Sequence, residues 1–318
     1  MPELPDVAVY VERLAELTQG ATLAQVRVAR PFLLRTVEPP LGAAHGRAVR
    51  GVRRMGKRLV LALDGELFLV LHLMIAGRLH WKPLGASQHR KLGQAAFDFA
   101  GPHAGTLLLT EAGSKRRASL HVVAGEDALA ALDRGGLEVV GAGRADRAGF
   151  AAALVRGNHT LKRALTDPRL FSGIGNAYSD EILHRARLSP FRRGPQLDER
   201  EVAALHEATV AVLEEWTERL RAEADSAARA GQLLPEKVTA FRPEMAVHGR
   251  YGKPCPACGA PVQRVIYAEN EANYCADCQT GGRLLADRVL SRLMKEDWPA
   301  TLEELEELQA RKRDASAP

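Results

Sequence analysis

The chain has 318 residues, of which 46% are hydrophobic and 26% charged, and its formal net charge is +5. This balance is typical of a globular protein and excludes wholesale disorder, and the length predicts two domains with room for a small third module. The longest apolar run, residues 67–77, is interrupted by His72 and is far shorter than the roughly 20 residues that cross a bilayer, so we expect no membrane partner. The first residues form no basic or apolar signal segment, which predicts an intracellular protein.

The first part of the chain has the pattern of one helix followed by strands. We expect the helix to run from Asp6, as its N-cap, to about Thr18. Residues 58–73 contain two apolar runs around the Asp-Gly pair at 64–65, which is a strong hairpin signal. Residues 1–125 therefore predict an N-terminal β-sandwich domain with a leading helix. Its further short strands are expected at 79–81, 96–99, 106–110 and 119–123.

After residue 125 the hydrophobic pattern becomes helical. We expect a helical domain of the helix–two-turn–helix type over 126–250, with a partly flexible loop from 224 onward. Its helices are expected at 127–132, 145–156, 158–165 and 181–187, and from 198 to beyond 220. In the C-terminal extension, 283–318, Thr301 and Glu304 form a capping box for a last helix. The final residues, 311–318, have the composition of a disordered tail.

All four cysteines lie in one short stretch, Cys255, Cys258, Cys275 and Cys278. Two C-x2-C pairs at this separation are typical of a four-thiolate zinc site on a β-hairpin, here a zinc finger over 251–282. The alternative, two disulfides, is disfavoured in an intracellular chain. A hairpin of this size buries too little core to fold without the metal, so we expect one structural Zn²⁺ per chain. A closed site of four protein ligands leaves no position open for catalysis.

Basic side chains gather in two stretches that are distant in sequence. Residues 47–58 hold six basic and no acidic side chains, and residues 151–195 hold eight basic and three acidic ones. Such stretches are compatible with two walls of a cleft that binds a polyanion, and equally with two solvated faces.

The N-terminus and a glycine-rich turn are candidates for chemistry. Removal of Met before Pro2 leaves a secondary amine, and an α-amine with a pKa of about 7.7–8.0 is partly unprotonated at neutral pH, so it can act as a nucleophile. Glu3 is a neighbouring acid or base. Residues 172–176 place two glycines and Asn176 at the start of a helix, where backbone N–H groups can bind a phosphate. An ordinary interhelical turn is the alternative reading of that segment.

Together these features resemble the formamidopyrimidine-DNA glycosylase and endonuclease VIII family of bacterial base-excision repair enzymes. The resemblance rests on P-E-L-P at the N-terminus, Lys57 between strands, H-L-x-x-x-G at 72–77, G-I-G-N-A-Y-x-x-E at 173–181 and the late four-Cys ribbon, in this order over residues 2–280. It implies a DNA glycosylase with AP-lyase activity, which releases oxidised bases through a Schiff base and then cleaves by β,δ-elimination.

The resemblance also implies roles for individual residues. Pro2 would be the nucleophile, Glu3 the general acid/base, and Lys57 a ligand of the phosphate beside the lesion. Lys162 and Asn176 would hold phosphates from the helix–two-turn–helix. The implied partner is double-stranded DNA with damaged bases or abasic sites, bound by a monomer in the bacterial cytoplasm at the nucleoid.

The chain departs from the family pattern where a lesion would be recognised. A damaged base must leave the stack to react, so side chains must fill the space that it vacates. The candidates are Ile75 or Met74 as wedge and, in the stretch that replaces the aromatic wedge, Lys115, Arg116 or Arg117 opposite the orphan base. Asn270 stands where the family carries an Arg in the zinc hairpin, and Arg264 is a candidate to compensate. The preferred lesion, oxidised purine or pyrimidine, is left open by these residues.

A non-catalytic protein that binds damaged DNA on the same scaffold is the alternative function. The Asn at position 270 and the missing aromatic wedge favour it, whereas the retention of Pro2 and Glu3 opposes it. Borohydride trapping on abasic DNA distinguishes the two, because only a catalytic amine forms a reducible adduct.

Overall fold

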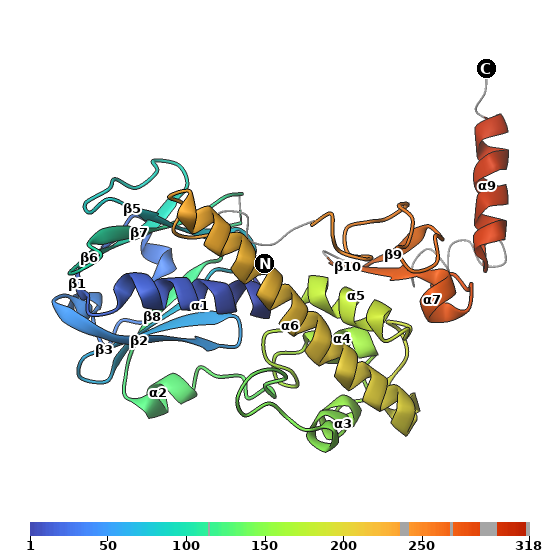
Figure 1. Ribbon diagram of the computed structural model, residues 1–318, viewed down its shortest axis with the longest axis horizontal. Coiled ribbons are helices and arrows are strands. Elements are labelled where there is room, and N and C mark those ends of the chain that lie inside the picture. The colour runs from blue at the N-terminus through green and yellow to red at the C-terminus, as the bar shows by residue number, and fades with distance from the viewer. Residues whose placement is uncertain (114, 236–241, 268–269, 287–297, 316–318) are drawn as a thin grey trace. The chain divides into compact units, whose positions relative to one another are not determined.

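The computed structural model describes residues 1–318 except 114, 236–241, 268–269, 287–297 and 316–318. The chain divides into two compact units (Figure 1). The sheet unit holds Met1–Glu138 together with Leu213–Ala240, and the helical unit holds Val139–Val212 together with Phe241–Pro318.

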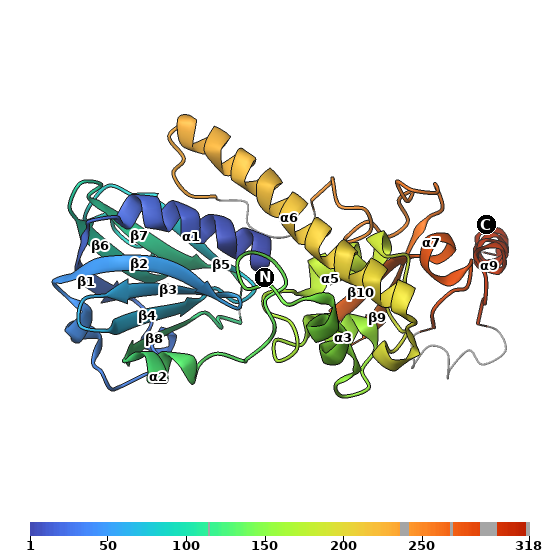
Figure 2. The ribbon, with the colours of Figure 1, turned by 60° about the horizontal axis from the view of Figure 1, so that its bottom comes forward.

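The sheet unit contains one antiparallel sheet with the strand order β5-β7-β6-β1-β2-β3-β4-β8. Only two residue pairs join β1 to β2, so the sheet falls into two four-stranded halves on either side of this short contact. Figure 2 shows the strands of the second half side by side. The elements are α1 (Leu4–Thr18), β1 (Thr22–Val28), β2 (Arg47–Met55), β3 (Arg58–Leu63), β4 (Leu67–His72), β5 (Gly77–Lys82), β6 (Gly93–Ala100), β7 (Gly105–Glu111), β8 (Ser119–Ala124) and α2 (Glu126–Ala130), with 3-10 turns at Pro31–Leu33 and Leu41–Ala44.

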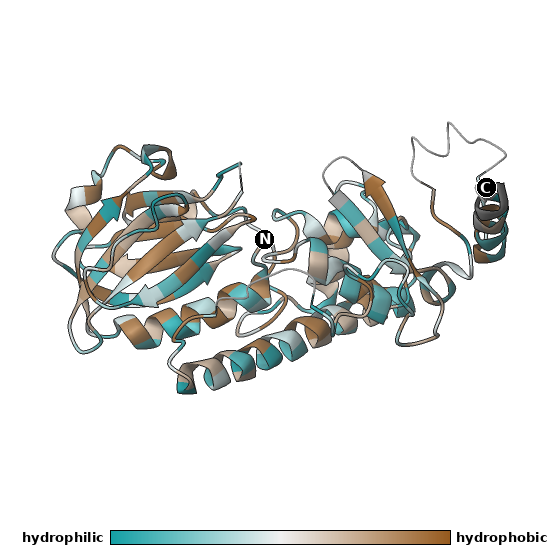
Figure 3. Cartoon of the chain, turned by 90° about the horizontal axis from the view of Figure 1, so that it is seen from above, coloured by the Kyte–Doolittle hydropathy of each residue, from teal (hydrophilic) through white to brown (hydrophobic). Residues whose placement is uncertain are grey.

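The two halves share one hydrophobic core. Side chains alternate between the faces of a strand, so Leu59 and Leu61 of β3 point into the core that Phe97 and Phe99 of β6 also fill. Hydrophobic and hydrophilic segments are interspersed along the strands of the sheet (Figure 3). The predicted β-sandwich is confirmed, and it is made by a single sheet that folds back on itself. The hairpin predicted around residues 64–65 is also confirmed, with Arg58 paired to His72 at its open end.

Helix α2 covers the outer face of the sheet, where Leu129 packs against Phe68 and Val123. It therefore belongs to the sheet unit, which extends to Glu138, beyond the boundary expected at residue 125.

Helix α6 (Glu199–Arg229) contributes to both units. Its second part, from Leu213 onward, belongs to the sheet unit, where Leu220 and Ala224 pack against Val9 of α1. Arg221 forms an ion pair with Glu12 of the same helix α1. The loop predicted from residue 224 is wrong for its first residues, because the buried contact of Ala224 keeps them helical.

The helical unit carries short helices and the hairpin with the cysteines. The β-hairpin predicted within the zinc finger is confirmed, with six residue pairs between its strands. Helix α4 begins later than expected, because Asn158 has a left-handed φ of 47° and Thr160 caps the helix. The remaining elements are α3 (Arg147–Val155), α4 (Leu161–Thr166), α5 (Asn176–Arg185), a 3-10 turn at Gly194–Gln196, β9 (Val262–Tyr267), β10 (Asn270–Cys275), α7 (Ala276–Thr280) and α9 (Leu302–Ala315).

The C-terminal extension contains the predicted capped helix. The Thr301 hydroxyl accepts the N–H of Glu304, and the Glu304 carboxylate accepts the N–H of Ala300. Helix α9 continues to Ala315, so the tail predicted to be disordered from residue 311 is helical over its first part. Residues 316–318 lie outside the described residues. None of the helices in the described ranges combines the length and the apolar character that a membrane span requires.

Candidate functional site

The N-terminal end of α1 brings a buried carboxylate beside the start of the chain. Glu3, and not Asp6 as expected, is the N-cap, and the two residues form a reciprocal capping box in which the Asp6 carboxylate accepts the N–H of Glu3 at 3.0 Å. Asp6 is therefore the third residue of the helix. Glu3 is only 3% exposed, and Pro2 is also buried.

Positive charges from two other elements lie near the same amine. Burial lowers the pKa of the α-amino group of Met1, Glu3 and Asp6 oppose this shift, and Arg78 and Lys57 add to it through their charges. A lowered pKa increases the unprotonated, nucleophilic fraction of an amine at neutral pH. The start of the chain therefore places the Met1 amine, with its lowered pKa, next to the buried Glu3 carboxyl group.

Lys57 is positioned by a tight turn between β2 and β3. Met55 pairs with Arg58, so Gly56 and Lys57 form a two-residue hairpin loop, and Gly56 supplies the left-handed φ of 61° that this loop needs. His72 lies on the neighbouring strand β4, and its pKa is lowered to about 4, mainly by burial and further by Arg58, Lys57 and His121. A neutral imidazole therefore lies near the Lys57 ammonium at pH 7.

The turn between β4 and β5 presents the two wedge candidates differently. Ile75 is 61% exposed, whereas Met74 is half-buried and has a left-handed φ of 52°. A Cβ at Gly77 would collide with the carbonyl oxygen of Leu73, so glycine is required where the turn closes. The guanidinium of Arg78 donates to the carbonyl of Gly77 at 2.7 Å, which secures the turn at its base.

The basic loop after β7 is exposed and is anchored by a buried acid. Lys115, Arg116 and Arg117 are exposed, and Ser114 of the same stretch lies outside the described residues. The carboxylate of Glu111, 2% exposed, accepts the N–H of Arg117 at 2.8 Å. Arg116 donates to the carbonyl of Lys91 at 2.6 Å. The loop thus exposes cationic side chains, while hydrogen bonds to Glu111 and Lys91 hold it in place.

In the helical unit, Asn176 is half-buried and begins helix α5 directly after a glycine turn. Gly173 has a φ of 80°, a conformation that favours glycine, and Gly175 is the N-cap. Lys162, in contrast, is buried, and its ammonium group does not reach solvent. It is 2% exposed, and its ammonium donates to the Asp180 carboxylate and to the Asn176 carbonyl, both at 2.6 Å. The Lys162 ammonium is thus held within the helical unit by the Asp180 carboxylate and the Asn176 carbonyl.

Tyr178 and Glu181 are buried on the same helix. The Glu181 carboxylate accepts three successive backbone N–H groups, from residues 246, 247 and 248, at 2.7–3.0 Å. Burial raises the pKa of Glu181, while these three amides oppose the rise. Glu181 thus fastens the segment before the zinc hairpin onto α5.

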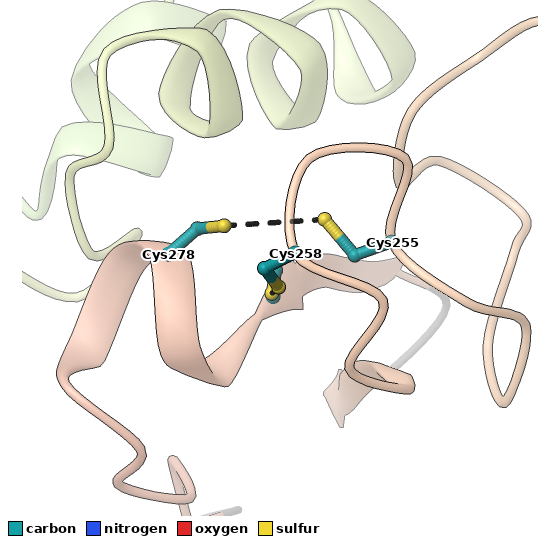
Figure 4. A group of neighbouring side chains, drawn as sticks. Cys255, Cys258 and Cys278 are labelled. Carbon is teal, nitrogen blue, oxygen red and sulfur yellow. Dashed lines mark hydrogen bonds between the residues drawn. The ribbon is translucent and has the colours of Figure 1, made fainter.

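The four cysteines form a cluster that can hold a metal ion. Their sulfur atoms all lie within 4.8 Å of one another, with 3.3 Å between Cys258 and Cys275 and 4.0 Å between Cys255 and Cys278 (Figure 4). These are separations between free cysteines, much longer than a disulfide bond. Four thiolates at about 2.3 Å from a tetrahedral zinc would lie about 3.8 Å apart, so the donor set fits the metal.

The thiols of the cluster differ in how readily they ionise. Burial, with a contribution from neighbouring thiols, raises the pKa of Cys278 to about 11 and raises that of Cys275 further, whereas hydrogen bonds from the Ala260 backbone and the other thiols lower the pKa of Cys258 against the effect of burial. The Nε2 of His184, on α5, lies 3.2 Å from the sulfur of Cys255. Burial lowers the pKa of His184, as do Arg185 and Arg187.

Three family models match successive parts of the chain. They describe the formamidopyrimidine-DNA glycosylase N-terminal domain (residues 1–112), the formamidopyrimidine-DNA glycosylase H2TH domain (141–225) and a zinc finger found in FPG and IleRS (252–281). A formamidopyrimidine-DNA glycosylase of Thermus thermophilus is 35% identical over 285 residues, which cover 89% of this chain and 100% of the relative. The chain belongs to the formamidopyrimidine-DNA glycosylase family.

Two further relatives match different lengths of the chain. The formamidopyrimidine-DNA glycosylase of Heliobacterium modesticaldum is 32% identical over 88% of this chain and 100% of its own. An uncharacterised formamidopyrimidine-DNA glycosylase-like protein of Mycobacterium tuberculosis is 43% identical over 145 residues, 45% of this chain and 86% of its own.

Solved structures of glycosylases in this family share the fold. The Lactococcus lactis enzyme bound non-covalently to DNA with an AP site has a TM-score of 0.74 at 22% identity, covering 87% of this chain and 99% of that one. MutM in complex with DNA containing carbocyclic 8-oxo-G has a TM-score of 0.74 at 23% identity, covering 88% and 100%.

Within this glycosylase scaffold, Arg264 is poorly placed to compensate for Asn270. In the hairpin, Asn270 pairs with Tyr267, whereas Arg264 pairs with Asn273, three rungs away. The Arg264 guanidinium lies over the ring of Tyr251 and within 3.7 Å of Glu271. The side chain of Asn270 is outside the described part of the structure, so only its strand position is given.

Arg78 and His72, which lie near Lys57 or the N-terminal amine, have no counterpart among the sequence-based candidates. Arg78 follows directly after the H-L-x-x-x-G motif, and His72 was considered only as part of that motif. The signal that identifies them is their position at the two ends of the turn that carries Ile75. Their role depends on the strands that bring them near Lys57 and the N-terminus.

Proposed function

We propose that the chain is a bifunctional DNA glycosylase and AP lyase of base-excision repair, acting on double-stranded DNA with oxidised bases or abasic sites. The observation that carries the proposal is the buried Glu3 carboxyl directly beside the buried Pro2 at the start of the chain. The relatives named formamidopyrimidine-DNA glycosylase support the class of reaction. We also propose that the protein acts as a monomer in the bacterial cytoplasm.

The reaction follows from the chemistry of a secondary amine. After removal of Met1, the Pro2 nitrogen forms a bond to C1′ of the damaged nucleotide, and the glycosidic bond breaks as the base leaves and takes up a proton. Glu3 protonates O4′ as the sugar ring opens, which leaves an iminium between Pro2 and C1′. Loss of a proton from C2′ then expels the 3′ phosphate, and a second elimination expels the 5′ phosphate.

The remaining site residues hold the DNA. Lys57 and His72 bind the phosphate beside the lesion, and Ile75 enters the stack in place of the flipped base. The exposed cations Lys115, Arg116 and Arg117 face the unpaired base. Asn176 binds a backbone phosphate, which fixes the register of the enzyme without reading sequence.

The Cys255–Cys278 cluster holds one structural Zn²⁺ per chain. Its support is the spacing of the sulfur atoms and the match of residues 252–281 to a zinc-finger family. All four metal positions are filled by protein sulfur, so the zinc stabilises the hairpin and takes no part in bond breaking.

Borohydride trapping tests the nucleophile. Incubation of the holoprotein with abasic duplex DNA and borohydride is expected to give a covalent adduct, and mass spectrometry should place it on the peptide that begins with Pro2. A protein with an uncleaved N-terminal extension serves as the control and should bind DNA without forming the adduct. An adduct on Lys57 would overturn the role of Pro2. Tight binding of lesion DNA with no adduct would instead support the non-catalytic alternative.

A further inference from the structure

A buried carboxylate in the helical unit connects the zinc hairpin to the glycine turn. The carboxylate of Asp180, on α5, accepts the ammonium of Lys162 at 2.6 Å, Nδ1–H of His248 at 2.8 Å and the side-chain amide of Asn273 at 3.2 Å. The Asp180 side chain has no exposed surface, and that of Lys162 is 3% exposed. The three donors come from α4, from the segment before the zinc finger and from β10.

The same ammonium group extends the network to the proposed phosphate contact. Lys162 also donates to the carbonyl oxygen of Asn176 at 2.6 Å. Asn273 lies two residues before Cys275 in the ladder of the zinc hairpin. A chain of three hydrogen bonds therefore runs from a strand that carries a metal ligand, through Asp180 and Lys162, to the first residue of α5.

The stability of this hydrogen-bond network depends on each of its members. A buried charge is tolerated only when its partners are in place, and removal of one partner leaves a group whose desolvation is no longer compensated. If the hairpin moves, Asp180 loses a donor, and the Lys162 ammonium that it orients shifts with respect to the Asn176 carbonyl. The conformation of the turn thus depends on the folded state of the hairpin.

We propose that Asp180 is a positioning residue through which the zinc-bound hairpin sets the geometry of the Gly175–Asn176 turn for DNA binding. This inference rests on the proposed function, because it assumes that Asn176 binds a phosphate. According to this inference, the metal stabilises the hairpin and also influences the phosphate contact that Asn176 makes on α5.

The first test needs no DNA. Asn273→Ala removes the hairpin donor and keeps the Lys162–Asp180 pair, and Gln263→Ala is the matched control, since Gln263 is a buried hairpin residue that donates to Pro261. In amide correlation NMR spectra of the zinc-loaded protein, Asn273→Ala should shift the backbone signals of Gly175 and Asn176, and Gln263→Ala should leave them in place. Unshifted signals in Asn273→Ala would overturn the proposal.

The second test uses DNA binding and separates the inference from the function. Asn273→Ala is expected to weaken binding to abasic duplex about 5- to 10-fold, and Asn176→Ala by a similar factor, while the double variant should bind no more than slightly worse than Asn176→Ala. Multiplicative losses in the double variant would show that Asn273 acts elsewhere and would refute the coupling. Unchanged binding in Asn176→Ala would refute the phosphate role in the proposed function, and the NMR result would then decide the coupling alone.

A conservative variant guards against misfolding. Asp180→Asn keeps the shape of the side chain and removes its charge, and it lies outside the cysteine cluster. It should retain one zinc per chain and show the same displaced Gly175 and Asn176 signals, more strongly than Asn273→Ala. Retained zinc with unperturbed turn signals would contradict the proposal.

Discussion

His184 of α5 lies within hydrogen-bond distance of the sulfur of Cys255, with 3.2 Å between Nε2 and Sγ. An N–H group directed at a metal-bound thiolate stabilises its negative charge and orients the ligand. This contact joins the helix that begins at Asn176 to the cysteine cluster through a side chain that is not itself one of the four sulfur ligands.

Loss of this donor should loosen the metal. We expect His184→Phe to bind zinc with roughly 10- to 100-fold lower affinity, measured by competition with a chromophoric chelator, because the donor to the Cys255 thiolate is lost. His159→Phe, in the same unit and away from the cluster, is the control. Wild-type zinc affinity in His184→Phe would show that the contact has no influence on the metal.

The acid/base role of Glu3 predicts a separation of binding from catalysis. Glu3→Gln preserves a side-chain oxygen for the capping box, so the helix should keep its start, but the proton transfer is lost. Base release in single-turnover assays should fall by roughly 10²–10⁴, while binding of abasic DNA persists. Glu16→Gln, an exposed position on the same helix, should retain full activity. A glycosylase rate of Glu3→Gln equal to that of the wild type would remove the assigned role.

Lys57 and Lys162 are both implied by the family resemblance to bind phosphates, but their substitutions should have different effects. Lys57→Ala should weaken DNA binding and reduce the dependence of log K on log salt by roughly one unit, as expected when one phosphate contact is lost. Lys162→Ala should leave the salt slope unchanged and instead lower the free energy of unfolding by about 3–5 kcal/mol, because Asp180 keeps a buried charge without its main partner. A reduced salt slope in Lys162→Ala would mean that its ammonium reaches DNA after all.

His72 should make the sheet unit sensitive to mild acid. Its pKa is lowered to about 4 in the folded chain, from 6.5 in the unfolded chain, so the unfolded state binds a proton first as the pH falls. The folded state is therefore destabilised as the pH falls from 6.5 toward 4, by about 2 kcal/mol between pH 7.5 and 5.

Fluorescence-detected urea unfolding in a Trp298→Phe background measures this effect, since Trp81 and Trp216 then both report on the sheet unit. His72→Gln should remove that part of the pH dependence, and His103→Gln, at an exposed position, should retain it. Identical pH dependences for His72→Gln and the wild type would exclude a buried neutral imidazole.

The features predicted correctly from sequence are those whose signals are local. An Asp-Gly pair between two apolar runs specifies the hairpin around residue 64, and two C-x2-C pairs specify the cluster of cysteines, because in each case the determining residues are close in the chain. The start of α1 shows the limit of such signals. The sequence predicts Asp6 as the N-cap, and only the reciprocal hydrogen bonds between the two residues show that Glu3 takes this position.

The features that were missed depend on distant partners. Lys162 has the sequence context of a phosphate ligand, and the sequence does not reveal that its ammonium pairs with the buried Asp180 on the next helix. Arg78 acquires significance only because a strand brings it near the N-terminus. Residues 224–229 have no apolar stripe strong enough to extend the prediction of α6, and it is packing against Val9 that keeps Ala224 helical.

The discontinuous composition of the sheet unit imposes an order on folding during synthesis. The core that Val7 and Tyr10 enter also contains Leu234, and the Tyr10 hydroxyl donates to the carbonyl of Pro235. A ribosome must therefore add about a hundred residues after Glu138 before this unit can close, which takes roughly 5–20 s at bacterial rates. Throughout that interval the nascent sheet unit lacks Leu234 in its core and the packing of Leu220 and Ala224 of α6 against Val9, so part of its apolar surface stays exposed.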